Sequence, residues 1–190
     1  MASYTPNHPW RTVSVVQGNA IQISGLFGAS ILAWYAARLG RRGTIWLITS
    51  RVLAYFCEHA LAHWVVGRLV GIRFVSYGVS GTAHSDLYPP GMNWIFSHLP
   101  LLSAHTDPAS RHAASPLARA ALYLAGPLTT VLVSLIIPIY GERHDIPHAR
   151  RFLIGLSAWS VMMLYGEAHP HGDLYRAWRA LRQREHQIDR

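Results

Sequence analysis

The sequence predicts an all-α membrane protein with about four transmembrane helices and a small β-hairpin after the second. Hydrophobic residues make up 51% of the 190 residues and charged residues 14%, whereas soluble domains average about 25% charged residues. The apolar residues are clustered into runs instead of being spread along the chain, and a short alternating segment separates the second run from the third. We therefore expect a multi-pass integral membrane protein, with residues 1–190 forming a single domain in contact with the lipid bilayer.

Residues 13–39 are the clearest candidate for a membrane-spanning helix. From Val13 to Ala37 the chain contains no charged residue, and this length exceeds the roughly 20 residues that a helix needs to cross a bilayer. The basic turn that follows, "RLGRRG", is expected to end this helix outside the apolar layer.

The second helix is expected over residues 44–70. It is apolar for most of its length, but it carries the ionisable residues Arg51, Glu58, His59, His63 and Arg68. Because such side chains are costly to expose to lipid, this helix cannot face the bilayer on all sides.

Residues 71–116 are expected to form a hairpin and a polar loop. The stretch "GIRFVSYGVSGT" alternates in the manner of a strand, and a His- and Pro-rich stretch follows it.

Three further helices are expected towards the carboxyl end of the chain. Residues 117–140 are charge-free after Arg119, and residues 152–168 form a slightly short apolar run. Residues 173–187 have helical periodicity, which predicts an amphipathic helix at the membrane surface, with arginines on one side and, on the other, Leu174, Trp178 and Leu181.

The basic charge of the chain does not indicate a nucleic-acid binder. The formal net charge is +8, and all 17 basic residues are arginine. These arginines lie between apolar runs instead of forming one basic stripe interleaved with aromatic residues, so no nucleic-acid partner is expected. The charges are better explained as flanks of membrane segments.

A histidine pair within the second helix is the first candidate functional feature. His59 and His63 are four residues apart, so on a helix both imidazoles point the same way and could grip one metal ion. The alternative is that each histidine forms a hydrogen bond to a neighbouring helix. The spacing does not decide between these two interpretations.

The residues around this pair resemble the site-2 protease family of intramembrane zinc metalloproteases. "GIRF" begins at Gly71, twelve residues after His59, where that family has a similar strand start. "AGP" at residues 125–127 is similar to the family's Ala-Gly-Pro helix, and "HPHGDLYRAWRAL" is similar to the segment that supplies its third ligand. The resemblance runs from about residue 52 to residue 181 and keeps the three motifs in order.

The resemblance implies a zinc site built from His59, His63 and Asp173, and a membrane-spanning peptide as substrate. A three-ligand site with an open position is the arrangement of catalytic zinc. The sequence departs from the family at two positions, because Leu174 replaces the glycine that follows the aspartate, and Ala60 replaces the catalytic glutamate.

Glu58 and Glu167 are the two carboxylates considered as substitutes for that glutamate. At about 100° per residue, residue 60 lies about 80° to one side of the metal direction and residue 58 about 120° to the other. Glu58 is therefore expected to point away from the metal and to pair with Arg51 or Arg68, or with a neighbouring helix. Glu167, at the end of the fourth helix, is a candidate for a relocated carboxylate near the metal.

The other histidines are given lesser roles. His169 and His171 flank Pro170 and could add to the site or replace a ligand, or could lie in an interfacial loop. Solvated or capping roles are expected for the histidines of the polar connections: His84, His98, His105, His112, His144 and His148.

Three functions remain to be compared, and the sequence leaves open whether the protein is an enzyme. The first is a site-2-protease-like protein that keeps the metal site but is impaired or inactive as a protease, and binds a transmembrane substrate or partner. The second is a structural or accessory subunit of a larger membrane complex, for which the small residues and seven tryptophans suit helix packing. The third, a di-iron membrane oxygenase, is disfavoured because no His-His dipeptide occurs.

Overall fold

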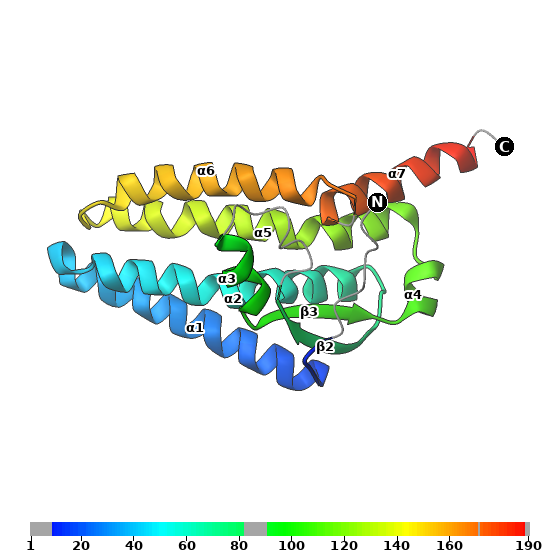
Figure 1. The fold of residues 1–190 in the computed structure, drawn as a ribbon, viewed down its shortest axis with the longest axis horizontal. Helices are drawn as coiled ribbons and strands as arrows, with labels where there is room; N and C mark the ends of the chain where they lie inside the picture. Colours follow the sequence, from blue (N-terminus) through cyan, green and yellow to red (C-terminus); the bar gives the residue numbers. More distant parts are fainter. Residues whose placement is uncertain (1–8, 82–90, 171, 189–190) are drawn as a thin grey trace.

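The computed structural model describes residues 9–81, 91–170 and 172–188. Within these ranges the chain is mostly helical, with seven α-helices and one small three-stranded antiparallel sheet. The long helices lie side by side, and the sheet lies towards the end of the bundle from which α7 extends (Figure 1). The prediction of a mostly helical chain with a small sheet is confirmed.

The first two long helices form an antiparallel pair. Helix α1 (Val15–Leu39) begins at a capping box, in which the Ser14 side chain accepts a hydrogen bond from the backbone N–H of Gln17. A 3₁₀ turn (Gly40–Arg42) joins it to α2 (Thr44–Leu69). Small residues let the two helices approach closely, since the Ser50 hydroxyl donates to the Ala29 carbonyl at 2.7 Å.

Helix α5 (Pro116–Arg143) is central to the bundle, because it packs against α2, α6 (Ala149–Glu167) and α7 (Asp173–Ile188). It begins where the Ser115 hydroxyl caps the helix and Pro116 occupies the first turn, where no backbone N–H is needed. One buried cluster joins α1, α2, α5 and α6, and a second, of Ala120, Ala177 and Ala180, joins α5 to α7. Both metal-ligand candidates of α2 and the start of α7 are thus packed against the same helix.

The sheet differs from the predicted hairpin. Strand β2 (Phe74–Ser80) pairs on one side with β1 (Arg11–Val13) and on the other with β3 (Leu101–Thr106). The strand that pairs with β2 along the chain therefore lies within the expected polar loop, and a further strand comes from the amino-terminal segment. Two short helices flank β3: α3 (Met92–His98) precedes it and α4 (Pro108–Ala113) follows it.

The sheet is anchored on the start of α1. Tyr77 of β2 is fully buried against Gly18, and its hydroxyl donates to the Asn19 side chain at 2.6 Å. Since the sheet is fixed to α1 and β3 packs on α2, it lies beside the helix that carries the histidine pair.

Two helical segments are long and apolar enough to cross a membrane, judged by length and composition: Val15–Arg42 and Pro116–Arg143. Large apolar side chains project from both, with more than half of each side chain exposed, among them Val16, Phe27, Trp34, Leu132 and Ile136. So many exposed large apolar side chains are consistent with a surface that meets a nonaqueous environment or a partner.

Candidate metal centre

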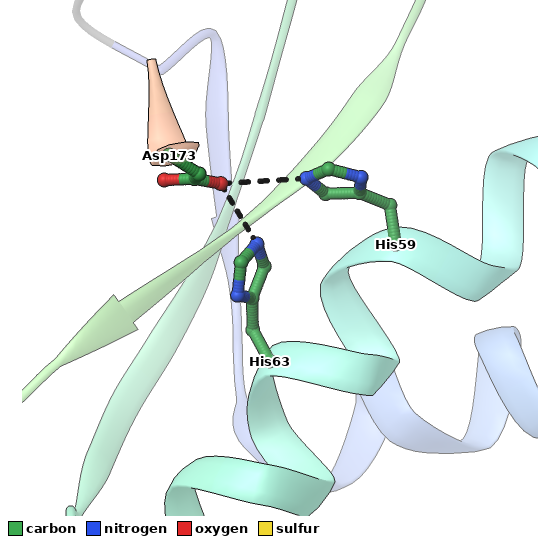
Figure 2. Close-up of side chains that lie close together, drawn as sticks. All are labelled: His59, His63 and Asp173. Atoms are coloured by element: carbon green, nitrogen blue, oxygen red, sulfur yellow. Dashed lines mark ion pairs between the residues drawn. The ribbon is translucent and has the colours of Figure 1, made fainter. Parts of the chain in front are cut away.

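The two histidines and the aspartate predicted as ligands come together at one point (Figure 2). His59 and His63 lie on one face of α2, a single turn apart, and Asp173 is the first residue of α7. The Asp173 Oδ2 atom lies 3.0 Å from Nε2 of His63 and 3.6 Å from Nε2 of His59. The candidate ligand atoms of these three side chains all lie within 4.8 Å of one another, so together they could hold one metal ion.

Two of the three distances between the donor atoms are close to those expected around a tetrahedral ion. Zinc binds histidine nitrogen and carboxylate oxygen at about 2.0–2.2 Å, so two donors of a tetrahedral site are about 3.3 Å apart. The two nitrogen–oxygen distances, 3.0 and 3.6 Å, lie on either side of this value. Two imidazoles and one carboxylate also form a donor set that zinc accepts.

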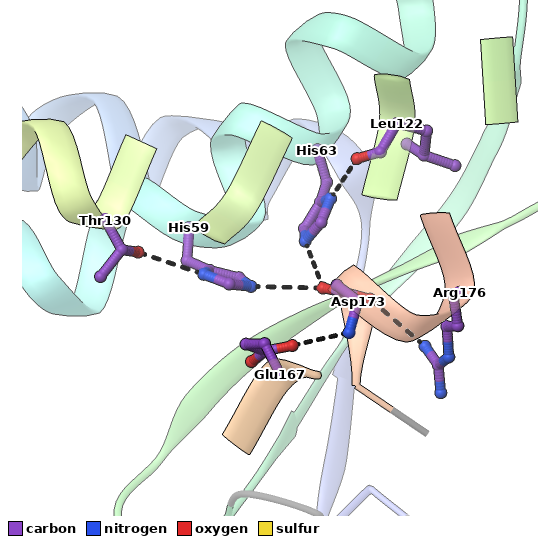
Figure 3. A network of polar contacts seen from close by, with 7 residues as sticks. All are labelled: His59, His63, Leu122, Thr130, Glu167, Asp173 and Arg176. Atoms are coloured by element: carbon purple, nitrogen blue, oxygen red, sulfur yellow. Dashed lines mark hydrogen bonds and ion pairs between the residues drawn. The ribbon is translucent and has the colours of Figure 1, made fainter. Parts of the chain in front are cut away.

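Helix α5 orients both imidazole rings through their other nitrogen atoms (Figure 3). The Nδ1 atom of His63 donates to the Leu122 carbonyl at 2.7 Å, and Nδ1 of His59 lies 3.2 Å from the Thr130 hydroxyl. Such partners fix ring orientation in metal sites and leave Nε2 to the ion. The hydrogen bonds to a neighbouring helix, considered above as an alternative to metal binding, are therefore compatible with it.

Gly126 lies between these two anchoring positions on α5. A Cβ atom at this position would stand 2.6 Å from Nε2 of His59 and closer still to Nε2 of His63. The absence of a side chain here lets α5 cross directly over the donor atoms. The "AGP" motif of residues 125–127 thus contributes to the site through its glycine.

The aspartate is held by groups on both sides of it (Figure 3). Its backbone N–H donates to Oε2 of Glu167 at 2.6 Å, and its Oδ1 atom lies 3.5 Å from the Arg176 guanidinium. Burial on its own would raise the pKa of Asp173, but hydrogen bonds from His59 and His63 and the charge of these rings lower it well below the ordinary carboxyl value. Asp173 is therefore a carboxylate, the form that binds a metal.

Neither of the carboxylates considered as a substitute base is free to face a metal-bound water. Glu58 is 1% exposed and its Oε1 atom lies 3.4 Å from the Arg51 guanidinium, so it makes the first of the two pairings considered. Glu167 lies beside the site, but its carboxylate is engaged with the Asp173 backbone. Ala60, at the position of the family's catalytic glutamate, is 3% exposed.

Five of the other described histidines make local contacts, whereas His148, which precedes α6, makes no side-chain capping hydrogen bond. Nδ1 atoms of three of them lie within hydrogen-bonding distance of the carbonyl four residues earlier, at His98, His112 and His169. His105 contacts the Ser76 hydroxyl, and the ring of His144 packs on Tyr140. His169 is not part of the three-residue group. His84 and His171 lie outside the described residues.

Sequence reasoning missed the residues that support the ligands. Leu122, Gly126 and Thr130 are spaced four residues apart on α5, so they share one helix face. Once Gly126 is placed over the histidines, this spacing points to its two neighbours. Arg176 lies three residues after Asp173, a spacing that makes two side chains of one helix neighbours.

The site is accessible on one side. The His59 side chain is 35% exposed, whereas His63 and Asp173 are mostly buried. Three protein ligands would leave a fourth position of a tetrahedral ion open, as in catalytic zinc sites.

Comparison with known proteins finds no match to this chain among protein-family models, curated proteins or solved structures. The resemblance to site-2 proteases accordingly rests on the sequence motifs alone.

Proposed function

We propose that this chain is a multi-pass integral membrane protein of the site-2 protease type, which binds zinc through His59, His63 and Asp173 but is impaired or inactive as a protease. The observation that carries the proposal is the convergence of the three donor atoms on one point, with an outer partner for each histidine. Metal ligands arranged in this way on packed helices are pre-oriented for one ion.

The missing base argues against efficient proteolysis. Zinc bound here would lower the pKa of a bound water and polarise a carbonyl group. Ala60 has no carboxylate to accept the proton, and Glu58 is paired with Arg51. Loss of a general base costs on the order of 10²–10⁴ in rate, so we assign the protein to binding a transmembrane segment, as substrate or partner, in preference to cleaving it.

The bilayer assignment rests on the two membrane-length helices and the apolar side chains that they expose. We extend it to four crossings, with α2 and α6 as the other two. The charged residues of α2 do not oppose this, since Arg51 and Glu58 are buried against each other and the exposed Arg68 lies in the last turn of the helix.

The first test is the metal content of the detergent-purified protein, measured by elemental mass spectrometry. We expect close to one zinc per chain, lost in His59→Ala and in Asp173→Ala. A matched control is His112→Ala, whose ring lies on α4 and bonds locally. Absence of metal from the unaltered protein would contradict the proposal.

The second test concerns catalysis. Ala60→Glu restores the residue order of the family, and we expect it to raise cleavage of a transmembrane peptide by about 10²-fold or more over the unaltered protein. Glu58→Gln in the unaltered protein serves to check whether any residual cleavage depends on that carboxylate.

The alternative function is a structural or accessory subunit of a larger membrane complex. The close helix contacts through small residues, such as that between Ser50 and Ala29, fit a packing module as well as an enzyme. This alternative predicts a protein without zinc that co-purifies with defined partner chains, so the metal measurement separates the two.

A further inference from the structure

The carboxylate of Asp173 turns its two oxygen atoms towards different partners (Figure 3). Its Oδ2 atom lies 3.0 Å from Nε2 of His63 and 3.6 Å from Nε2 of His59. Its Oδ1 atom lies 3.5 Å from the guanidinium of Arg176, which is three residues further along α7. Oδ2 is therefore the oxygen directed at the place where the candidate ligand atoms converge.

The main chain of Asp173 is fixed without Arg176. Asp173 is the first residue of α7, and its backbone N–H donates to Oε2 of Glu167 at 2.6 Å. This contact holds the backbone of the ligand, but the carboxylate can still turn about its terminal torsion, which has broad minima in aspartate. A partner for Oδ1 restricts that rotation.

Arg176 has the position and the chemistry of such a partner. Residues three apart on a helix are neighbours, so its guanidinium reaches the carboxylate one turn earlier. The Arg176 side chain is 47% exposed and that of Asp173 is 16% exposed, so the arginine approaches the ligand from the exposed side of α7. Each candidate ligand thus has an outer partner, because Thr130 and Leu122 serve the two histidines.

The contact is expected to affect metal binding more than folding. An ion pair with a half-exposed partner adds little to the stability of a fold, because solvent screens the charges. The outer partner of a ligating carboxylate has a larger effect on metal affinity, since it fixes the orientation of the ligand.

We infer that Arg176 is a positioning residue for the metal centre: it holds Oδ1 of Asp173 and thereby presents Oδ2 alone to the ion. The inference rests on the proposed metal site. It gives Arg176 a role that differs from that of Glu167, which holds the backbone of the same ligand.

The test compares Arg176→Gln, which removes the charge, with Arg176→Lys, which keeps it. The matched control is Arg179→Gln, because Arg179 is also exposed on α7 but lies six residues from Asp173. Zinc affinity of the detergent-purified full chain is measured by competition with a chelator. We expect about a 10-fold loss in Arg176→Gln, at the lower end of the usual effect because the guanidinium is half exposed. Arg176→Lys should retain most of the affinity and Arg179→Gln all of it.

Two further readouts distinguish positioning of the ligand from a structural role. Metal-free Arg176→Gln should unfold at the same temperature as the metal-free unaltered protein, since the lost ion pair is largely screened. With Co²⁺ in place of zinc, Arg176→Gln should show weaker visible absorption. Release of Oδ1 lets the carboxylate bind through both oxygens, and five-coordinate Co²⁺ absorbs less strongly than four-coordinate Co²⁺.

The outcomes separate this inference from the proposed function. Zinc binding by the unaltered protein combined with unchanged affinity in Arg176→Gln would overturn the inference alone. An equal loss in Arg179→Gln, a lower unfolding temperature of metal-free Arg176→Gln, or an unchanged Co²⁺ spectrum would do the same. If the unaltered protein binds no zinc, the proposed function and the inference both fail.

Discussion

Gly126 of α5 lies directly against Nε2 of His63, so that any side chain at position 126 would occupy the space in which the donor atoms of the candidate site meet. This close approach is possible because glycine has no Cβ atom. A substitution at position 126 should therefore affect metal binding without lowering the stability of the fold.

Gly126→Ala is expected to abolish or strongly weaken zinc binding without unfolding the protein. The three atoms nearest to the added methyl group belong to the two imidazoles, and any movement of the rings that makes room for it takes them out of the ligating position. Helix stability should rise by up to about 1 kcal/mol, because alanine is favoured over glycine in helices. Zinc titration and thermal unfolding of the same preparation measure both effects.

Gly155→Ala is the matched control, because a Cβ atom at this position of α6 meets nothing within 4 Å. It should show the helix effect alone and retain full zinc affinity. Undiminished zinc binding by Gly126→Ala would show that the ion does not lie where the three donors converge.

The long helices were predictable from sequence because their signals are local, whereas the short helices α3 and α4 lie in the segment expected to be a hairpin and a loop. Uncharged runs of membrane length mark α1 and α5. The sheet was not predictable to the same degree. β1 pairs with a strand more than 60 residues later, with Arg11 opposite Val79, and local periodicity contains no information about such a pairing.

The ligand set could be proposed from the sequence because helical spacing places His59 and His63 on one face and the family resemblance supplies Asp173. The supporting groups depend on tertiary contacts. Thr130 and Leu122 are recognisable only once α5 is known to cross α2 at Gly126. Glu58 shows both what the sequence predicts and what it does not. Its direction away from the metal follows from helix geometry, but its pairing with Arg51 instead of Arg68 depends on tertiary packing.

Removing one residue of the buried Arg51–Glu58 ion pair is expected to destabilise the protein more than replacing both residues. Arg51→Met leaves the Glu58 carboxylate buried without a counter-charge, and we expect the free energy of unfolding to fall by about 3–5 kcal/mol. Replacing both residues, Arg51→Met with Glu58→Leu, should recover most of this loss, because two apolar groups avoid the desolvation cost. Unfolding of the detergent-solubilised protein measures the difference.

Docking of the sheet on α1 is expected to depend on Gly18. A Cβ atom there would stand 2.8–2.9 Å from two ring atoms of the fully buried Tyr77 and closer still to its Cδ2 atom, and overpacking of this kind costs about 1–3 kcal/mol. Gly28→Ala, on the same helix, adds a methyl group at an ordinary 3.4 Å from Leu53. Thermal unfolding should therefore show a loss for Gly18→Ala and no loss for Gly28→Ala.

Glu167 connects the end of α6 to the third ligand, and two substitutions distinguish its possible roles. Its Oε2 atom accepts the backbone N–H of Asp173. Glu167→Gln keeps a carbonyl oxygen that can accept this bond, so zinc affinity should change little. Glu167→Ala removes the acceptor and frees the start of α7, and we expect zinc affinity to fall about 10–100-fold.

A peptide-cleavage assay on the Ala60→Glu background tests whether Glu167 is instead a relocated base. A carboxylate that only holds the Asp173 backbone can be replaced by the amide with cleavage retained, because the acceptor is conserved. A carboxylate that takes a proton from the metal-bound water cannot, since an amide is not a base at neutral pH, and cleavage would fall by about 10²–10⁴-fold. The contact with Asp173 leads us to expect the first result.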